Sequence, residues 1–323
     1  METGARLTST STPSASDLNS DAETDWLAVT AALAACNANR LAGAREIRRL
    51  ELTLWFSLAA LFITALVIAY RNGSVYFATT AFAISCLLLA AIQSVTERQR
   101  RRLQGDAYRV LLPSVLSRID DLVIEFGQAS DSMERMPGHY FLPRQKARHD
   151  LVVIGRWSGL VFSVSQTQFT RAAGDDRDEI TFWGVIVCVK LKSVFPGDFA
   201  ALQRPEKARS LLRQTTLPDQ LQVLYSEATE QRGQYEFVST APDAAETRLG
   251  RMLHALDAVR TLPLDGVAQI GVRNGDAFLL LPFGNAPLAL PDVLIAIDIE
   301  RDLKSLRDNL SDILQAAQAA TEI

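Results

Sequence analysis

The sequence has few of the residues from which metal centres and disulfide frameworks are built. Its 323 residues include only three cysteines and three histidines. Cys36, Cys86 and Cys188 lie far apart, so no two of them have the spacing of metal ligands, and their odd number gives no complete disulfide set. Each is therefore interpreted as a packing residue in a protein of a reducing compartment.

The sequence also lacks the motifs of common enzymes. It contains no G-x-S-x-G, no H-E-x-x-H, no Walker-type loop and no dinucleotide-binding fingerprint. His149 and Asp150 are adjacent, and neighbours in a strand point to opposite faces, so they do not form a catalytic pair. His254 has apolar neighbours within a predicted helix. We therefore predict no catalytic residue, no cofactor and no metal.

An excess of positive charge is missing from most of the chain. The formal net charge is −4, and acidic residues outnumber basic ones beyond residue 102. Nucleic acids are bound by clustered Lys and Arg, so no nucleic-acid partner is expected. The acidic segment 174–179 offers carboxylates to a divalent cation. It lacks the spacing of a calcium loop and contains Arg177, which favours a solvated connection between strands.

Two long stretches contain no charged residue. The first, 52–70, has nineteen residues and as a helix is about 28 Å long, close to the roughly 30 Å of a bilayer's hydrocarbon core. The second covers 72–96. We predict a transmembrane hairpin over 51–97, with helices at about 52–70 and 75–96. The alternative is a buried hairpin in a soluble protein, whose helices are usually amphipathic or shorter.

Arginines bracket these stretches and predict their orientation. The clusters comprise Arg40, Arg45, Arg48 and Arg49 before the first stretch, and Arg98, Arg100, Arg101 and Arg102 after the second. The connecting turn carries only Arg71. Cytoplasmic flanks of membrane helices are enriched in Lys and Arg, so both flanks are expected in the cytoplasm and the turn outside. The same arginines are expected to contact anionic lipid heads of the bilayer.

The residues before the hairpin divide into a tail and a helix. Residues 1–19 are rich in Ser, Thr and Ala and are predicted to be disordered. Ser20 and Glu23 have the spacing of a capping box, which predicts a cytoplasmic helix over 20–50. Its apolar face, marked by Trp26 and Leu33, is expected to pack on the distal domain or on a partner.

The distal residues 98–323 are predicted to form a cytoplasmic α+β domain with a mainly antiparallel sheet and packed helices. Gly105 and Pro113 are expected to interrupt the helix that leaves the membrane. An amphipathic helix is predicted over 115–126. Strands are predicted between 150 and 283, because turn residues punctuate runs rich in β-branched and aromatic residues.

Two hairpins and two helices complete the predicted distal domain. The hairpins turn at Trp157-Ser158-Gly159 and at Asn274-Gly275, which is the strongest short hairpin signal in the sequence. Helices are predicted over about 243–259 and 299–318, and the second has leucines and isoleucine on one side. Hairpins between neighbouring strands favour antiparallel pairing over a parallel sheet.

Short motifs follow one another in a fixed order in this domain. They are Gly155-Arg156-x-Ser158-Gly159-Leu160-x-Phe162, Phe182–Val187, Phe195-Pro196-Gly197, Tyr235–Thr240 and Asp243-x-x-Glu246-x-Arg248-Leu249. The order resembles the bacterial family catalogued as domain of unknown function 3137, over about residues 150–283. The resemblance implies two membrane helices before a cytoplasmic part. Together with the arginine clusters, it predicts a location in the bacterial inner membrane with both termini cytoplasmic. It implies no particular chemistry.

The last motif is the candidate site. Asp243, Glu246 and Arg248 form a charged group at the start of a predicted helix, where they can act in recognition. Alternatively, Asp243 caps the helix, Glu246 returns a bond to the cap and Arg248 pairs nearby. Glu236 belongs with them, and alternation in a strand places it opposite Tyr235 and Phe237.

The sequence therefore predicts an integral membrane protein that tethers a cytoplasmic binding, sensing or scaffolding module, with a protein partner in the cytoplasm or membrane. One alternative is a membrane-tethered enzyme, since catalytic residues can converge from distant parts of a chain; it requires a pocket that joins the candidate acids, Arg248 or a histidine. Another is a structural subunit of a membrane complex, which requires an exposed apolar patch on the first or last helix.

Overall fold

The computed structural model describes residues 26–72, 75–138, 141–142, 146–173, 177–204, 220–230 and 232–323. The chain divides into two compact units. A helical unit consists of Asp25–Val115 and Leu290–Ser305, and a sheet unit contains Leu116–Ala289 and Leu306–Ile323. The predicted tail and the predicted helix start at Ser20 lie outside the described residues.

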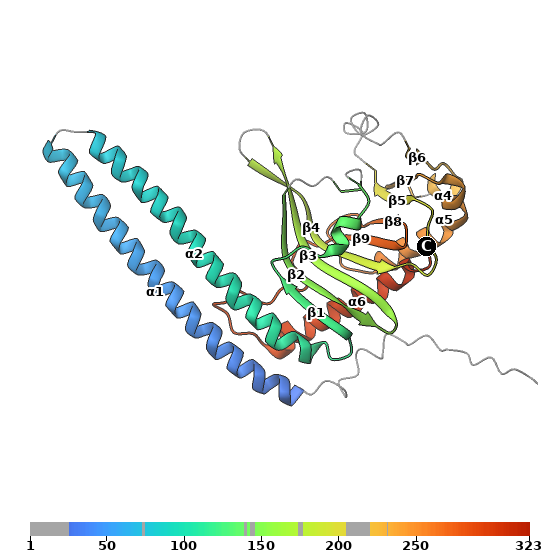
Figure 1. Ribbon diagram of the computed structural model, residues 1–323, viewed down its shortest axis with the longest axis horizontal. Helices are drawn as coiled ribbons and strands as arrows, with labels where there is room; N and C mark the ends of the chain where they lie inside the picture. Colours follow the sequence, from blue (N-terminus) through green and yellow to red (C-terminus); the bar gives the residue numbers. More distant parts are fainter. Residues whose placement is uncertain are drawn as a thin grey trace, which may run out of the picture. The chain divides into compact units, whose positions relative to one another are not determined.

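Two long helices form most of the helical unit. Helix α1 covers Trp26–Asn72, α2 covers Val75–Val115, and the two run side by side in opposite directions (Figure 1). Helix α1 therefore runs from the predicted cytoplasmic segment, described from Trp26, into the charge-free stretch without interruption. The interruptions predicted at Gly105 and Pro113 are wrong: packing of α2 along α1 outweighs the low helix propensity of both residues.

The sheet unit is built on nine strands in the order β1-β2-β3-β4-β9-β8-β5-β7-β6 among the described residues. Every described pair is antiparallel, as predicted. The strands are β1 Asp120–Phe126, β2 Lys146–Trp157, β3 Leu160–Ala173, β4 Arg177–Lys190, β5 Asp198–Gln203, β6 Gln222–Val223, β7 Tyr235–Ser239, β8 Gln269–Arg273 and β9 Asp276–Pro282. The α+β class is thus confirmed.

Tight turns set the register of the two predicted hairpins. Strands β2 and β3 are joined by Ser158 and Gly159, whose φ angles are 47° and 82°. Strands β8 and β9 are joined by Asn274 and Gly275, with a φ of 55° at Asn274. Positive φ at such positions matches the twist of the flanking strands, and both predicted hairpins are confirmed.

Two longer helices, α5 and α6, follow strand β7 in the chain and belong to the sheet unit. Helix α5 covers Pro242–Val259 and lies on β7 and β8, and α6 covers Ser305–Ala320 after a π-helical turn, η3, over Ile299–Lys304. Shorter helices are η2, Asp131–Arg135, and α4, Glu227–Glu230. The predicted helix over 243–259 is confirmed. The one over 299–318 exists with a π-helical first turn, and its apolar side is buried.

The central part of the sheet is buried on both faces. One face holds a core cluster that includes Phe169, Phe182 and Phe278, together with Met133 and Phe141 from the connection before β2. The opposite face is buried as well, since alternate residues such as Phe199, Phe237 and Leu279 are at most 1% exposed. A sheet covered in this way explains the nearly continuous apolar runs of β4 and β9.

The amphipathic helix predicted over 115–126 is wrong. Helix α2 ends at Val115, and strand β1 begins at Asp120. Val123 and Ile124 pair with Ile154 and Val153 of β2. Spaced apolar residues over so short a segment fit a helix and a strand almost equally well, and pairing with a buried strand decides the outcome.

Candidate functional site

Large apolar side chains of α1 are exposed between Glu51 and Arg71. They include Trp55, Phe56, Ile63, Val67 and Tyr70, of which Tyr70 is 91% exposed. Over the described residues, one helical stretch, Val29–Ile68 in α1, is long and apolar enough to cross a membrane. Length and composition thus support one membrane-crossing helix, in α1, and do not support the predicted pair.

Helix α2 also exposes apolar side chains beside α1. Leu87 is 71% exposed and Phe82 is 60% exposed, and Ile84, Leu88 and Val95 are each more than 40% exposed. The helical pair therefore presents an apolar belt on both members. A belt of this extent is unusual for a surface in water and is typical of interaction with lipid or another protein.

Most of the predicted topology-setting arginines lie on the surface of the helical pair. Arg45, Arg48, Arg49, Arg98, Arg101 and Arg102 are exposed, and Arg100 is partly exposed. Arg100 donates to Glu51 across the two helices at 3.0 Å, and Arg101 donates to Glu97 at 2.9 Å. These positions leave basic side chains available beside the apolar belt.

Arg40 differs from the other arginines because it is only 2% exposed. Its guanidinium donates to the main-chain oxygens of Pro291, at 2.7 Å, and Ile295, at 3.4 Å. We call residues 290–297, which Arg40 holds against the helical pair, the strap. Arg40 therefore has a structural role, and unlike the exposed arginines its side chain does not face solvent or lipid heads.

Three other side chains hold the strap by its main chain. Asn37 accepts a hydrogen bond from the Ile297 N–H and donates to the Ile297 oxygen, both at 2.9 Å. Gln104 donates to the Leu290 oxygen at 3.2 Å, and the Tyr108 hydroxyl accepts from the Leu290 N–H at 2.8 Å. Polar residues of both helices thus satisfy main-chain groups of an irregular segment, which contains a turn at Asp292–Ile295 and has no strand partner among the described elements.

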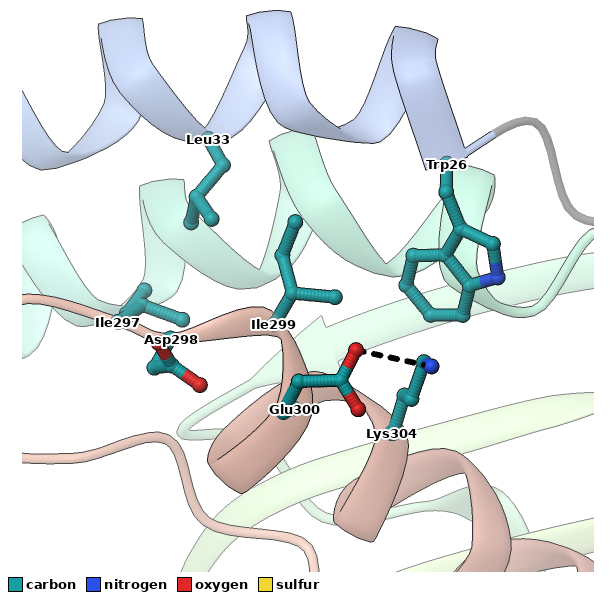
Figure 2. A pocket seen from close by; sticks show the side chains of 7 residues that line it. All are labelled: Trp26, Leu33, Ile297, Asp298, Ile299, Glu300 and Lys304. Carbon is teal, nitrogen blue, oxygen red and sulfur yellow. Dashed lines mark ion pairs between the residues drawn. The ribbon is translucent and has the colours of Figure 1, made fainter.

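A pocket of about 460 Å³ lies where the start of α1 meets the residues after the strap (Figure 2). It is lined by Trp26, Leu33, Ile297, Asp298, Ile299, Glu300 and Lys304. Glu300 and Lys304 form an ion pair at 2.9 Å, and the Lys304 ammonium lies 5.4 Å from the centre of the Trp26 ring. The apolar face predicted at Trp26 and Leu33 therefore packs on a segment from the end of the chain.

A second cavity, of about 320 Å³, lies between α1 and α2 within the apolar belt. We call it the groove. It is lined by Leu50, Leu54, Ser57, Leu58 and Leu61 from α1 and by Leu88, Ala91, Ile92, Val95, Thr96 and Gln99 from α2. Its wall is almost entirely apolar, so it suits a hydrocarbon rather than a polar ligand.

The charged motif of the sheet unit does not cap α5. The N-cap is Ala241, and no side chain bonds to the free N–H groups there. Asp243 and Glu246 are exposed on the first turns. The capping interpretation is therefore wrong, because the helix begins one residue before Asp243, at Pro242, where φ is already fixed for a helix.

Arg248 contacts main-chain oxygens instead of an acidic partner. Its guanidinium donates to Ser193 at 3.2 Å, Val194 at 3.0 Å and Ile323 at 2.8 Å. It also lies over the Phe195 ring, 5.4 Å from the ring centre. Arg248 thus connects α5 to two segments of the sheet unit, a role that the sequence did not indicate.

Glu236 is partly buried in β7, between the buried Tyr235 and Phe237. The predicted alternation is confirmed. Neither the pocket nor the groove includes Glu236, Asp243, Glu246 or Arg248. The recognition role of this motif stays a prediction.

A buried acid in the sheet unit was missed by sequence reasoning. The side chain of Asp276, at the start of β9, is 6% exposed and pairs with Arg135 at 2.9 Å and Lys190 at 2.6 Å. Burial raises the pKa of the neighbouring Cys188 thiol from 9.0 to about 12. The position directly after the Asn-Gly turn was the only available signal, and it does not identify the two cations.

The histidine and carboxylate candidates do not form a catalytic or metal site in the described structure. The His149 ring pairs with the Thr167 hydroxyl at 3.0 Å, whereas Asp150 accepts from Arg148. Among the described residues, no group of three or more His, Cys, Asp or Glu side chains is placed to hold a metal ion. Residues 174–176 of the acidic segment lie outside the described residues.

Comparison with known proteins adds little to this picture. No family pattern matches the chain, and no curated protein sequence matches it. Among solved structures, the chain is similar to the crystal structure of the mycobacterial trehalose monomycolate transport factor A, TtfA. The match has 12% sequence identity and a TM-score of 0.33, and it covers 68% of this chain and 94% of that chain. At that score the likeness carries no argument about fold or function.

Proposed function

We propose that the helical pair anchors this protein in a membrane, with α1 crossing the bilayer and α2 returning through it. The observation that carries the proposal is the apolar belt. Its charge-free stretch in α1 has large exposed side chains and matches the thickness of a bilayer. Burial of this surface in hydrocarbon is favourable by about 25 cal/mol per Å² of apolar area, and a helix keeps its backbone hydrogen bonds there.

The exposed arginines support an orientation with both flanks in the cytoplasm. Six arginines of the two clusters are exposed, and the turn contributes only Arg71. The positive-inside preference then places the turn outside and both termini inside. The motif order that resembles the bacterial family of unknown function supports a location in the bacterial inner membrane.

The sheet unit would then act as a cytoplasmic module that binds a protein partner, senses an intracellular state or serves as a scaffold. Its packing supports binding rather than catalysis: the buried Asp276 and the partly exposed Arg248 are occupied in contacts within the unit. The exposed acids Asp243 and Glu246 are available for a basic surface of a partner.

Membrane insertion is tested by extraction of whole membranes with alkaline carbonate. The native chain is expected in the pellet. Ile63→Lys with Val67→Lys should move it toward the soluble or degraded fraction, because each Lys at a helix centre costs about 2.5–3.5 kcal/mol of insertion free energy. Gln315→Lys, on an exposed position of α6, is the matched control and should stay in the pellet. Complete extraction of the native chain by carbonate would refute the anchor.

Orientation and the second crossing are tested with topology reporters. Alkaline phosphatase fused after Ser74 is expected to be active, and the same reporter at the C-terminus is expected to be inactive. An active reporter at the C-terminus would refute the cytoplasmic placement of the sheet unit. A C-terminal fusion on the side opposite the N-terminus would show one crossing in place of two.

A further inference from the structure

The groove between α1 and α2 has the length of one leaflet of a bilayer. Its lining runs from Leu50 to Leu61 on α1 and from Leu88 to Gln99 on α2. Eleven residue steps in a helix measure about 16 Å, which is about half of the roughly 30 Å hydrocarbon thickness. The groove therefore extends from the charged end of the belt to about the middle of the proposed membrane.

The two ends of the groove differ in chemistry. Gln99 and Leu50 lie at the end where Arg49, Arg100 and Glu51 are neighbours along the helices, and Arg100 and Glu51 are paired there. The opposite end is closed by leucines from both helices. The groove itself is lined by apolar and uncharged polar residues, and arginines flank one of its ends along both helices. An apolar cavity with basic residues just beyond one end has the pattern of a site for an amphiphile with an anionic head.

We propose that the groove binds one acyl chain of an anionic membrane lipid, whose headgroup lies at the arginines beside Leu50 and Gln99. This inference rests on the proposed membrane anchor. The exposed Arg49, next to Leu50, and the exposed Arg98, next to Gln99, supply positive charge at the headgroup level. They attract an anionic head, and the effect is largest close to the surface.

The size of the cavity favours an acyl chain over a protein helix. At about 320 Å³ it lies at the low end of the roughly 300–1,000 Å³ typical of small-molecule sites. A helix with its side chains is about 10–12 Å wide and requires a broad face rather than a slot between two helices. An empty slot would leave its leucine lining without van der Waals partners, and a hydrocarbon chain supplies them.

A bulky residue in the groove tests the proposal. Ala91 lines the groove, whereas the adjacent Ala90 is exposed and outside it. Ala91→Trp is expected to fill the groove, and Ala90→Trp is the matched control that adds the same side chain to the outer surface. The full chain and both variants are placed in nanodiscs of mixed phosphatidylglycerol and phosphatidylcholine, released in the gas phase and weighed by native mass spectrometry.

The wild type and Ala90→Trp are expected to retain one phosphatidylglycerol per chain, and Ala91→Trp at least tenfold less. Arg49→Gln with Arg98→Gln should abolish the preference for phosphatidylglycerol over phosphatidylcholine while keeping a bound lipid. Equal retention by Ala91→Trp and the wild type would overturn the groove as the site, and no headgroup preference in the wild type would overturn an anionic lipid. Wild-type dimers that Ala91→Trp lacks would place a second copy of the chain in the groove and overturn the lipid.

These outcomes are separable from failure of the proposed function. Carbonate extraction of the same preparations shows whether the chain is anchored. A chain that stays in the membrane and retains no lipid contradicts the groove inference alone. A chain that carbonate extracts completely contradicts the anchor itself.

Discussion

Replacement of Asn37 by alanine should release the strap from the helical pair. Asn37 is the only side chain shown to bond both main-chain groups of one strap residue, with 2.9 Å to the N–H and 2.9 Å to the oxygen of Ile297. Ile297 is 3% exposed, so water has little access to its N–H and oxygen while the strap is bound to the helices. Asn37→Ala leaves both groups without this partner and removes no apolar packing.

The expected cost follows from the two lost bonds. A buried main-chain group left without a partner costs about 1–3 kcal/mol, so two partly buried groups give about 2–4 kcal/mol. Alanine has a higher helix propensity than asparagine, which returns about 0.5 kcal/mol to α1. The net loss of about 1.5–3.5 kcal/mol should raise the exchange rate of the Ile297 amide by about 10- to 400-fold where local opening governs exchange.

Hydrogen–deuterium exchange of the full chain in detergent measures this effect on the peptide that contains 290–298. Asn39→Ala is the matched control, because Asn39 is exposed two residues further along α1 and gains the same helix propensity. The control should exchange like the wild type in this peptide. Faster exchange in both variants, or in neither, would contradict the strap as the element that Asn37 holds.

Three further perturbations address the sheet unit. Gly184→Ala would place a Cβ 2.0 Å from the Leu281 oxygen and should destabilise the chain by about 3 kcal/mol or more in urea unfolding. The control Gly250→Ala has no neighbour within 4 Å of the added Cβ and should stabilise the chain by about 0.5–1 kcal/mol. Equal effects of the two substitutions would contradict the close approach at Gly184. Burial raises the pKa of the Cys188 thiol from 9.0 to about 12, so the folded state binds the thiol proton more tightly than the unfolded state does. From about pH 9 upward, the stability of the wild type should therefore fall relative to Cys188→Ala, by at most about 1.4 kcal/mol per pH unit. Parallel stability profiles of the two proteins over this pH range would refute the pKa shift. Arg248→Lys should cost about 1–2 kcal/mol in the same assay, because one ammonium cannot serve three main-chain oxygens from the positions of a guanidinium fork, and an unchanged midpoint would contradict that role.

The hairpins could be predicted from sequence because their information is local. Ser158, Gly159 and Asn274 have positive φ angles in two-residue turns, and the flanking strands pair where such turns form. The helix over 243–259 is equally local, since its apolar residues recur every three or four positions. Elements of this kind need no knowledge of the rest of the chain.

The segment 115–126 shows where local information ends. Its apolar residues fit a helical spacing, and the chain instead pairs Val123 with Ile154 of β2. The energy that decides between these alternatives comes from a strand some thirty residues away. The continuation of α2 through Gly105 and Pro113 has the same origin, because contact with α1 compensates for poor local propensity.

The contacts of the strap could not be predicted for a further reason. Asn37 and Ile297 are 260 positions apart, and the interaction joins a side chain to a main chain. Every residue type has the same main-chain oxygen, so the sequence of the partner segment does not indicate that it accepts these hydrogen bonds. The sequence shows such an interaction only through a polar residue on or beside the apolar face of a helix. Asn37 lies beside the apolar face of α1.

Arg40 belongs to the arginine cluster before the charge-free stretch but has a different role in the structure. Counted with its neighbours, it adds to the positive flank from which the orientation was predicted. Its burial and its bonds to Pro291 and Ile295 show that it stabilises the strap. The predicted asymmetry does not depend on it, because exposed arginines persist on both flanks and only Arg71 lies at the turn. The positive-inside preference acts through charges that stay beside the membrane surface, so the exposed arginines support the proposed orientation and Arg40 stabilises the attachment of the strap.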